Sequence, residues 1–110
     1  MEGRDHQHRK VAEVAKEIGG VLRRQARKRW ETVRTAERNE GNRHVWRFQP
    51  GPDGGERFLH VSHEAMQGED AASTVIEQLR SGRCFERLHN GPETSLLLSK
   101  GGRLEAYPVN

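Results

Sequence analysis

The sequence predicts an α+β fold in which a long N-terminal helix precedes an antiparallel sheet of four to five strands with one short helix. Apolar residues recur with helical spacing along the first third of the chain. Two runs rich in Val, Phe and Trp flank a Gly-Pro-Asp-Gly-Gly turn, which is typical of a β-hairpin. A second helical pattern and further short runs follow. We therefore expect the order α-β-β-α-β-β-β in a single α+β domain covering residues 1–110.

The first predicted helix covers residues 10–40, whereas the polar residues 1–9 are expected to form a frayed tail. Helical steps place its apolar residues on one narrow stripe. The stripe comprises Val11, Ala15, Ile18, Leu22, Ala26 and Val33. Gly19 and Gly20 lie inside the pattern and each costs roughly 1 kcal/mol relative to Ala. One continuous helix, a kinked helix and two helices all remain compatible with these glycines.

Residues 43–108 are expected to supply the sheet and the short helix. Residues 44–48 and 57–61 form the first two strands, and residues 51–55 form the turn between them. Strand alternation predicts a buried face made of Trp46, Phe48, Leu59 and Val61. Val45 and Phe58 fall on the other face, which we therefore expect to be partly covered as well.

Residues 67–70 are predicted to open the short helix, with acidic residues in its first turn, and the helix ends before Gly82, a typical helix stop. Its apolar side consists of Ala72, Val75, Ile76 and Leu79. Three short strands are then expected at residues 84–88, 94–98 and 103–107. Tight turns at residues 90–91 and 100–102 separate them.

Charge is distributed unevenly along the chain, whose formal net charge is +3. Residues 1–47 hold 13 basic and 7 acidic side chains, whereas residues 48–110 hold 6 and 9. This asymmetry favours an anionic partner for the basic half, or an acidic half of another subunit. Cys84 is the only cysteine, so no internal disulfide can form, and no apolar run has the length of a signal peptide or a membrane span. We expect a soluble, cytoplasmic protein of bacterial type.

A column of basic residues is the most specific feature of the first predicted helix. Lys16, Arg23, Arg27, Arg34 and Arg38 would fall within about 60° of one another on a helix, with Trp30 beside them. Such a column suits phosphate backbones, because Arg binds phosphate bidentately and counterion release drives association. The sequence therefore predicts a non-catalytic module that contacts nucleic acid without reading its bases. Alternatively, the column is a solvated face that nearby Glu13, Glu17 and Glu31 partly neutralise.

The apolar stripe of the same helix is longer than the small sheet needs, so a homodimer through this helix is a second prediction. An adaptor whose basic helix docks on an acidic protein is a related alternative. The stripe is rich in small residues, which argues against a membrane-surface helix. The other alternative is that the stripe lies across the sheet of its own chain.

Catalytic and metal-binding patterns are weak. His60 and His63 fall on opposite sides of a strand, as do Cys84 and His89, so neither pair is expected to act together. Residues 69–70, Glu-Asp, are explained as favourable charges at a helix N-terminus. We predict no enzyme activity, no metal, no cofactor and no small-molecule ligand. A pocket that brings several of His44, His60, His63, Cys84 and His89 together would reverse the prediction about enzyme activity.

Overall fold

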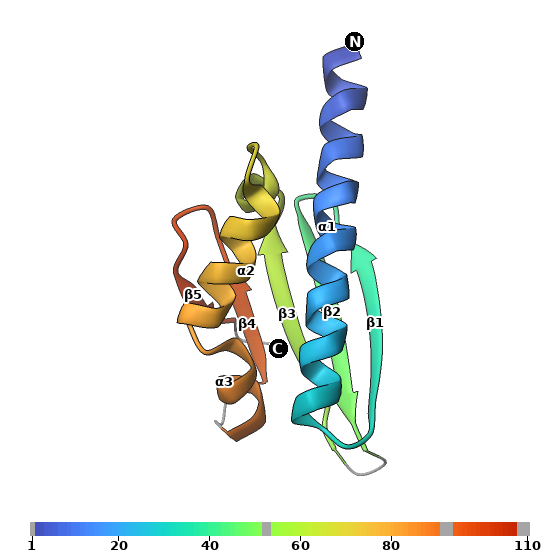
Figure 1. Ribbon diagram of the computed structural model, residues 1–110, viewed down its shortest axis with the longest axis vertical. Coiled ribbons are helices and arrows are strands. Elements are labelled where there is room, and N and C mark those ends of the chain that lie inside the picture. The colour runs from blue at the N-terminus through green and yellow to red at the C-terminus, as the bar shows by residue number, and fades with distance from the viewer. Residues whose placement is uncertain (1, 52–53, 91–93, 108–110) are drawn as a thin grey trace.

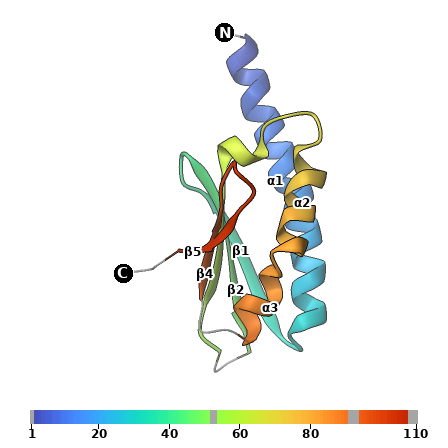
Figure 2. The same cartoon turned by 90° about the vertical axis from the view of Figure 1, so that its left-hand side faces the viewer.

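Three helices pack on one face of a five-stranded sheet in the computed structural model, which describes residues 2–51, 54–90 and 94–107 (Figures 1 and 2). Side chains are described from Val11 onward, Asn90 excepted. The three α-helices are α1 (Glu2–Arg29), α2 (Ala71–Ser81) and α3 (Cys84–Asn90), and a short 3₁₀ turn, η1 (His63–Met66), precedes α2. The strands are β1 (Val33–Asn39), β2 (Arg43–Pro50), β3 (Arg57–Ser62), β4 (Ser95–Leu98) and β5 (Leu104–Ala106). The predicted α+β class and strand count are confirmed.

The sheet is mixed, so the prediction of a purely antiparallel sheet is wrong. Its strands lie side by side in sequence order, β1-β2-β3-β4-β5. All neighbours are antiparallel except β3 and β4, which are parallel, with Leu59 opposite Leu96. The physical reason is the connection between them, because η1, α2 and α3 return the chain to the starting end of the sheet before β4 begins.

Helix α1 differs from the predicted helix at both ends. It begins at Glu2, so residues that were expected to fray continue the helix, and it runs without interruption through Gly19 and Gly20. It ends at Arg29, not near residue 40, because the next residues form strand β1 against β2. Thr35 pairs with Phe48 and Glu37 with Trp46, and these backbone pairs outweigh the helical spacing of the segment. The expected helix stop at residues 39–42 instead joins two strands, where Gly41 has a φ of +85°.

The core lies between α1, α2, α3 and one face of the sheet. Trp46, Phe48, Leu59 and Val61 are buried there as predicted. The helical stripe contributes Ala15, Ile18, Leu22 and Ala26, all buried within the chain. These four residues of the stripe are thus buried against their own chain, whereas Val11 is only partly buried and Val33 belongs to β1. Val45 is also buried, although it points to the sheet face that carries no helix, which confirms that this second face is partly covered.

The second half of the chain contains one predicted helix and one unpredicted helix. Helix α2 buries Ala72, Val75 and Leu79 as expected, and Gly82 is its C-cap. The expected strand at 84–88 is wrong, because these residues form α3. Cys84 and Leu88, four residues apart, are both buried, which is helical spacing. Strands at 95–98 and 104–106 match the predictions, whereas residues 52–53 and 91 of the predicted turns lie outside the described residues.

Candidate functional site

The predicted basic column is divided between two faces of the molecule. Lys16 and Arg23 lie on the flank of α1 nearest β1, where both line a cleft, and the helical spacing places Arg27 on the same flank. Arg34 and Arg38 belong to β1, opposite Gln49 and Val45 of β2. Since Trp46 and Phe48 face the helices, Arg34 and Arg38 point to the other side of the sheet. The single column on one helix is therefore wrong, and only its first three members share a surface.

Trp30, predicted to lie beside the column, is part of the core. Only 7% of its surface is exposed. Its ring centre lies 6.1 Å from that of Phe48, 5.9 Å from Phe85 and 5.7 Å from His89. A ring enclosed in this way has no free face on which a nucleic-acid base could stack.

The C-terminal part of α1 carries a dense group of cations, which we call the basic segment. It consists of Arg23, Arg24, Arg27, Lys28 and Arg29. Arg24, Arg27 and Lys28 are exposed, and the other two are partly exposed. Within the described part of the chain, none of these cations forms an ion pair or a side-chain hydrogen bond, and Lys16 forms none either. In the described part of the chain, these cations therefore form no ion pair with Glu13, Glu17 or Glu31, the residues that were expected to neutralise them.

A polar cleft of about 620 Å³, which we call the α1–β1 cleft, lies between α1 and the edge of the sheet. It is lined by Val11, Ala12, Ala15, Lys16, Arg23, Glu37, Asn39, His44, His63 and Gln67. Of this lining, Lys16 and Arg23 were predicted as binding residues from the sequence, whereas the residues of β1 were not. Alternation along residues 33–39, once they are recognised as a strand, would have placed Glu37 and Asn39 on the helix side.

A buried donor, the indole N–H of Trp46, lies beside residues that line the α1–β1 cleft. Glu37 Oε2 lies 3.0 Å from Nε2 of His44, whose ring centre is 4.5 Å from that of Trp46. Trp46 is 2% exposed, and its Nε1 has no hydrogen-bond partner among the residues that the structure describes. A Cβ atom on Gly19 would meet that Nε1 at 3.1 Å, the guanidinium of Arg23 at 3.2 Å and Oε2 of Glu37 at 3.5 Å. Gly19 therefore allows the indole N–H, the guanidinium and the cleft to share one small region.

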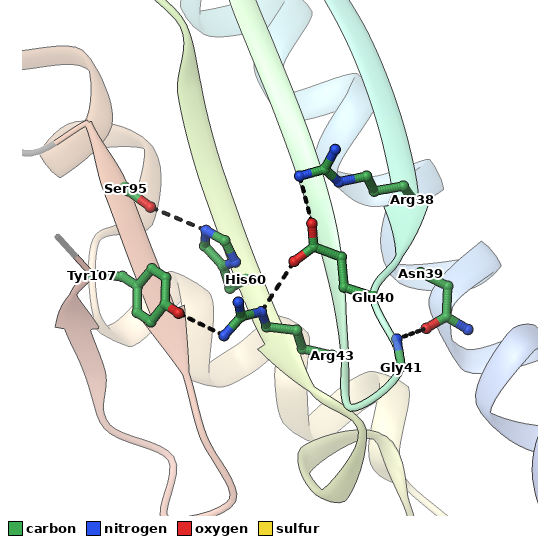
Figure 3. A network of polar contacts seen from close by, with 8 residues as sticks. All are labelled: Arg38, Asn39, Glu40, Gly41, Arg43, His60, Ser95 and Tyr107. Carbon is green, nitrogen blue, oxygen red and sulfur yellow. Dashed lines mark hydrogen bonds and ion pairs between the residues drawn. The ribbon is translucent and has the colours of Figure 1, made fainter. Parts of the chain in front are cut away.

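The sheet face that carries no helix holds a chain of polar contacts across the strands (Figure 3). Glu40 forms ion pairs with Arg38 at 2.5 Å and with Arg43 at 3.3 Å. Arg43 donates to the hydroxyl of Tyr107 at 2.7 Å. Because Glu40 and the Tyr107 hydroxyl both accept hydrogen bonds from its guanidinium, Arg43 is held as part of the sheet surface.

The same contacts continue beneath Tyr107 to a buried histidine. The ring centre of Tyr107 lies 4.5 Å from that of His60, and Nε2 of His60 lies 3.1 Å from Oγ of Ser95. Burial lowers the pKa of His60 below its ordinary value, and the positive charge of Arg43 lowers it further. For Glu40, partial desolvation raises the pKa, but the hydrogen bond from Arg43 and the charges of Arg38 and Arg43 outweigh it, so the pKa is lowered.

The five residues that could have formed a catalytic centre do not converge. His44 and His63 line the α1–β1 cleft, whereas His60 lies on the opposite face of the sheet. His89 lies beside Trp30 on α3. Burial raises the pKa of the Cys84 thiol to about 12, so the nucleophilic thiolate is scarce at neutral pH.

Over the described ranges, no group of three or more His, Cys, Asp and Glu side chains is placed to hold a metal ion. No helix in the same ranges is both long and apolar enough to cross a membrane. Comparison with protein families, with curated proteins and with solved structures found no match to this chain. The chemistry of its surface is therefore the guide to its function.

Proposed function

We propose that this protein is a non-catalytic module that binds the phosphate backbone of nucleic acids through the basic segment of α1. The observation that carries the proposal is the absence of internal partners for these cations in the described part of the chain. By contrast, Arg38, Arg43 and Arg47 of the sheet all pair with carboxylates. Unpaired cations release their counterions when they meet phosphates, which supplies the driving force for binding.

The arrangement of the basic segment suits a broad, sequence-independent contact. Arg23, Arg24, Arg27 and Lys28 cover about 140° of the helix circumference at 100° per residue. Leu22 and Ala26 fix the opposite side of the helix in the core, so the basic side faces outward. Guanidinium groups bind phosphate oxygens bidentately and without regard to base identity.

A purely structural role accounts for only part of the segment. Cations in the last turn of a helix stabilise it by interacting with the helix dipole, and Arg27, Lys28 and Arg29 occupy that turn. The dipole effect falls off beyond the last turn. It therefore does not explain Lys16, Arg23 or Arg24, which extend the positive surface toward the middle of the helix.

The proposed contact surface differs from the predicted column. Arg24 and Lys28 join it, whereas Trp30 is buried and Arg38 is paired with Glu40 on the other face. Arg34 is exposed, but it points away from α1, and so it is not part of the surface.

A titration of labelled DNA and RNA with the protein, at low and near-physiological salt, tests the proposal. The logarithm of the binding constant should fall linearly with the logarithm of the salt concentration. The double variant Arg24→Glu, Arg27→Glu should reduce affinity by about tenfold or more and should lower the salt slope by about two. These two residues do not line the α1–β1 cleft, so the variant leaves that site intact.

The matched control is Arg80→Glu, Arg103→Glu, which changes the net charge equally at exposed residues of α2 and the loop before β5. The proposal requires the control to bind far more tightly than the α1 variant. An equal loss of affinity in both variants would show that net charge alone causes the effect, which would contradict the proposal. No binding of DNA or RNA at low salt would also refute it.

The second candidate function is an adaptor whose basic segment docks on an acidic protein. The same unpaired cations favour it, and it predicts no binding of nucleic acid at low salt. The homodimer alternative has less support, because the four central residues of the helical stripe are buried in the core of their own chain. A dimer that forms regardless would need another surface.

A further inference from the structure

We propose that the α1–β1 cleft is a binding site for a phosphate monoester, separate from the basic segment although Arg23 belongs to both. The cleft lies between α1 and the strands β1 and β2, and its volume of about 620 Å³ falls in the range of small-molecule sites. The proposal does not depend on the protein binding a nucleic-acid backbone.

The charges that line the cleft favour an anion. Lys16 and Arg23 supply two positive charges without an ion pair to any described residue. Glu37 is the acidic residue of the lining, and its Oε2 lies 3.0 Å from His44 Nε2. Because Glu37 repels an anion, the phosphate is expected on the side of the cleft formed by Lys16 and Arg23.

The buried indole of Trp46 is the second, independent observation. Its Nε1 has no hydrogen-bond partner among the described side chains and backbone although the side chain is 2% exposed, and buried donors are rarely left in this state. At Gly19 this N–H lies near the guanidinium of Arg23 and Oε2 of Glu37, both from residues that line the cleft. Oε2 of Glu37 is already held by Nε2 of His44 at 3.0 Å. An anionic oxygen bound beside Arg23 would accept from the indole N–H and satisfy it.

The donors come from several directions, which fits a tetrahedral anion better than a planar carboxylate. Lys16 and Arg23 approach from α1. Trp46, on β2, does not line the cleft itself but lies behind Arg23 and His44, which do. Asn39 accepts from Gly41 N through its Oδ1, so its amide N–H groups are the donors that it turns to a ligand. A monoester offers three terminal oxygens to these donors, and guanidinium is well matched to phosphate geometry.

Indole ¹H–¹⁵N NMR gives a direct readout, because the chain has two Trp residues and hence two indole signals. The Trp30→Phe variant assigns them. Titration with adenosine 5′-monophosphate should shift the Trp46 signal saturably and leave that of Trp30, which is packed against Phe48 and Phe85, unchanged. The unchanged Trp30 signal also reports that the fold is intact.

Lys16→Gln tests the site itself, with Lys28→Gln as the matched control on the same helix outside the cleft. We expect Lys16→Gln to weaken the monophosphate about tenfold and Lys28→Gln to have little effect. The absence of a Trp46 shift at millimolar ligand, or equal weakening by both variants, would overturn the proposal. Adenosine without phosphate must leave the Trp46 signal in place.

Two sources of the monoester are distinguished by comparing 5′-phosphorylated and 5′-hydroxyl oligonucleotides. Tighter binding of the 5′-phosphorylated strand than of the mononucleotide, again with a Trp46 shift, assigns the site to strand ends. The reverse order assigns it to a free small molecule. Binding of both oligonucleotides with equal affinity and no Trp46 shift would refute the cleft and leave the backbone contact by the basic segment standing.

Discussion

Nε2 of His60 lies 3.1 Å from Oγ of Ser95, and both residues are buried on the sheet face that no helix covers. The contact joins β3 to β4, the one parallel pair among the described strands. Tyr107 lies over the imidazole, and Arg43 donates to the Tyr107 hydroxyl. A histidine that is covered in this way depends on Ser95 for its hydrogen bond.

Loss of the Ser95 hydroxyl should therefore destabilise the protein. In Ser95→Ala, the imidazole loses the partner that Nε2 has in the native state, and such a loss costs about 1–3 kcal/mol. Urea unfolding at pH 7.5 measures the difference. Ser99→Ala is the control, because Ser99 is exposed just after β4 and its side chain has no contact with His60. Equal stability of the two variants would contradict the role given to Ser95.

Acidification should reduce stability through His60. Burial first, and then the charge of Arg43, hold its folded-state pKa below the ordinary 6.5, whereas Glu40 acts in the opposite direction. The unfolded chain binds a proton as the pH falls through about 6.5, and the folded chain does not until lower pH. The contribution of His60 to the free energy of unfolding is thus fully present above about pH 6.5 and is lost as the pH falls below that value.

Unfolding midpoints between pH 7.5 and 5.0 test this linkage. His60→Gln should flatten the profile, whereas His89→Gln, at an exposed position, should keep the slope of the parent protein. A His60→Gln profile as steep as that of the parent would assign the acid sensitivity to other groups.

The two glycines of α1 should respond differently to alanine. A Cβ at Gly20 meets nothing closer than 3.8 Å, so Gly20→Ala should gain about 0.5–1 kcal/mol from helix propensity. A Cβ at Gly19 lies 3.1 Å from Trp46 Nε1 and 3.2 Å from the Arg23 guanidinium, so neighbouring groups must shift. Gly19→Ala should consequently fall short of Gly20→Ala in unfolding free energy, and a larger gain at Gly19 would refute the close approach.

Trp30 should contribute to stability and not to binding. Trp30→Ala empties a site between Phe48 and Phe85 and should cost about 3–5 kcal/mol. Trp30→Phe keeps most of the packing, so its affinity for DNA or RNA should stay within about twofold of the parent value. A tenfold loss of affinity in a folded Trp30→Phe protein would restore Trp30 to the binding surface.

Cys84 should be inert in the folded protein. Its thiol is 2% exposed, and burial raises its pKa to about 12. A disulfide reagent at pH 8 should modify it only as fast as the protein unfolds, so the reaction should accelerate sharply in urea. Rapid reaction in buffer alone would show that the α3 region opens readily.

The sequence predicted the parts of the fold where local preference and burial agree. The pairs Trp46–Leu59 and Phe48–Arg57 formed where alternation and the glycine turn both indicated a hairpin. Helix α2 formed where apolar spacing and Gly82 agreed. In both places, the residue spacing that favours the element also turns its apolar side chains toward the core.

The errors arose where two patterns overlap in the same residues. Residues 33–39 keep a helical spacing of basic residues, yet they also alternate as a strand, and pairing with β2 decided the outcome. The second half of the predicted column, Arg34 and Arg38, therefore lies on the other face of the sheet. Residues 84–88 are too few for periodicity to separate a strand from a helix turn.

The α1–β1 cleft could not be predicted, because it depends on where separate elements meet. Lys16 and Glu37 are distant in sequence, and only the packing of α1 across β1 and β2 places both on one cleft. The unpartnered Trp46 N–H has no signature in the sequence, where Trp46 was simply a core residue. Gly19 was treated as a fault in the helix, although it gives α1 room beside Trp46.

The parallel pairing of β3 with β4 has a consequence for the order of folding. Strands β1, β2 and β3 are joined by short connections, whereas β4 must return to β3 across the long segment 63–94. Closing that loop is entropically slower than forming neighbouring hairpins. Until β4 arrives, the backbone edge of β3 beside Leu59 and Val61 is open to pairing with other chains. Refolding yield should therefore decline as protein concentration rises, even though the finished sheet covers that edge.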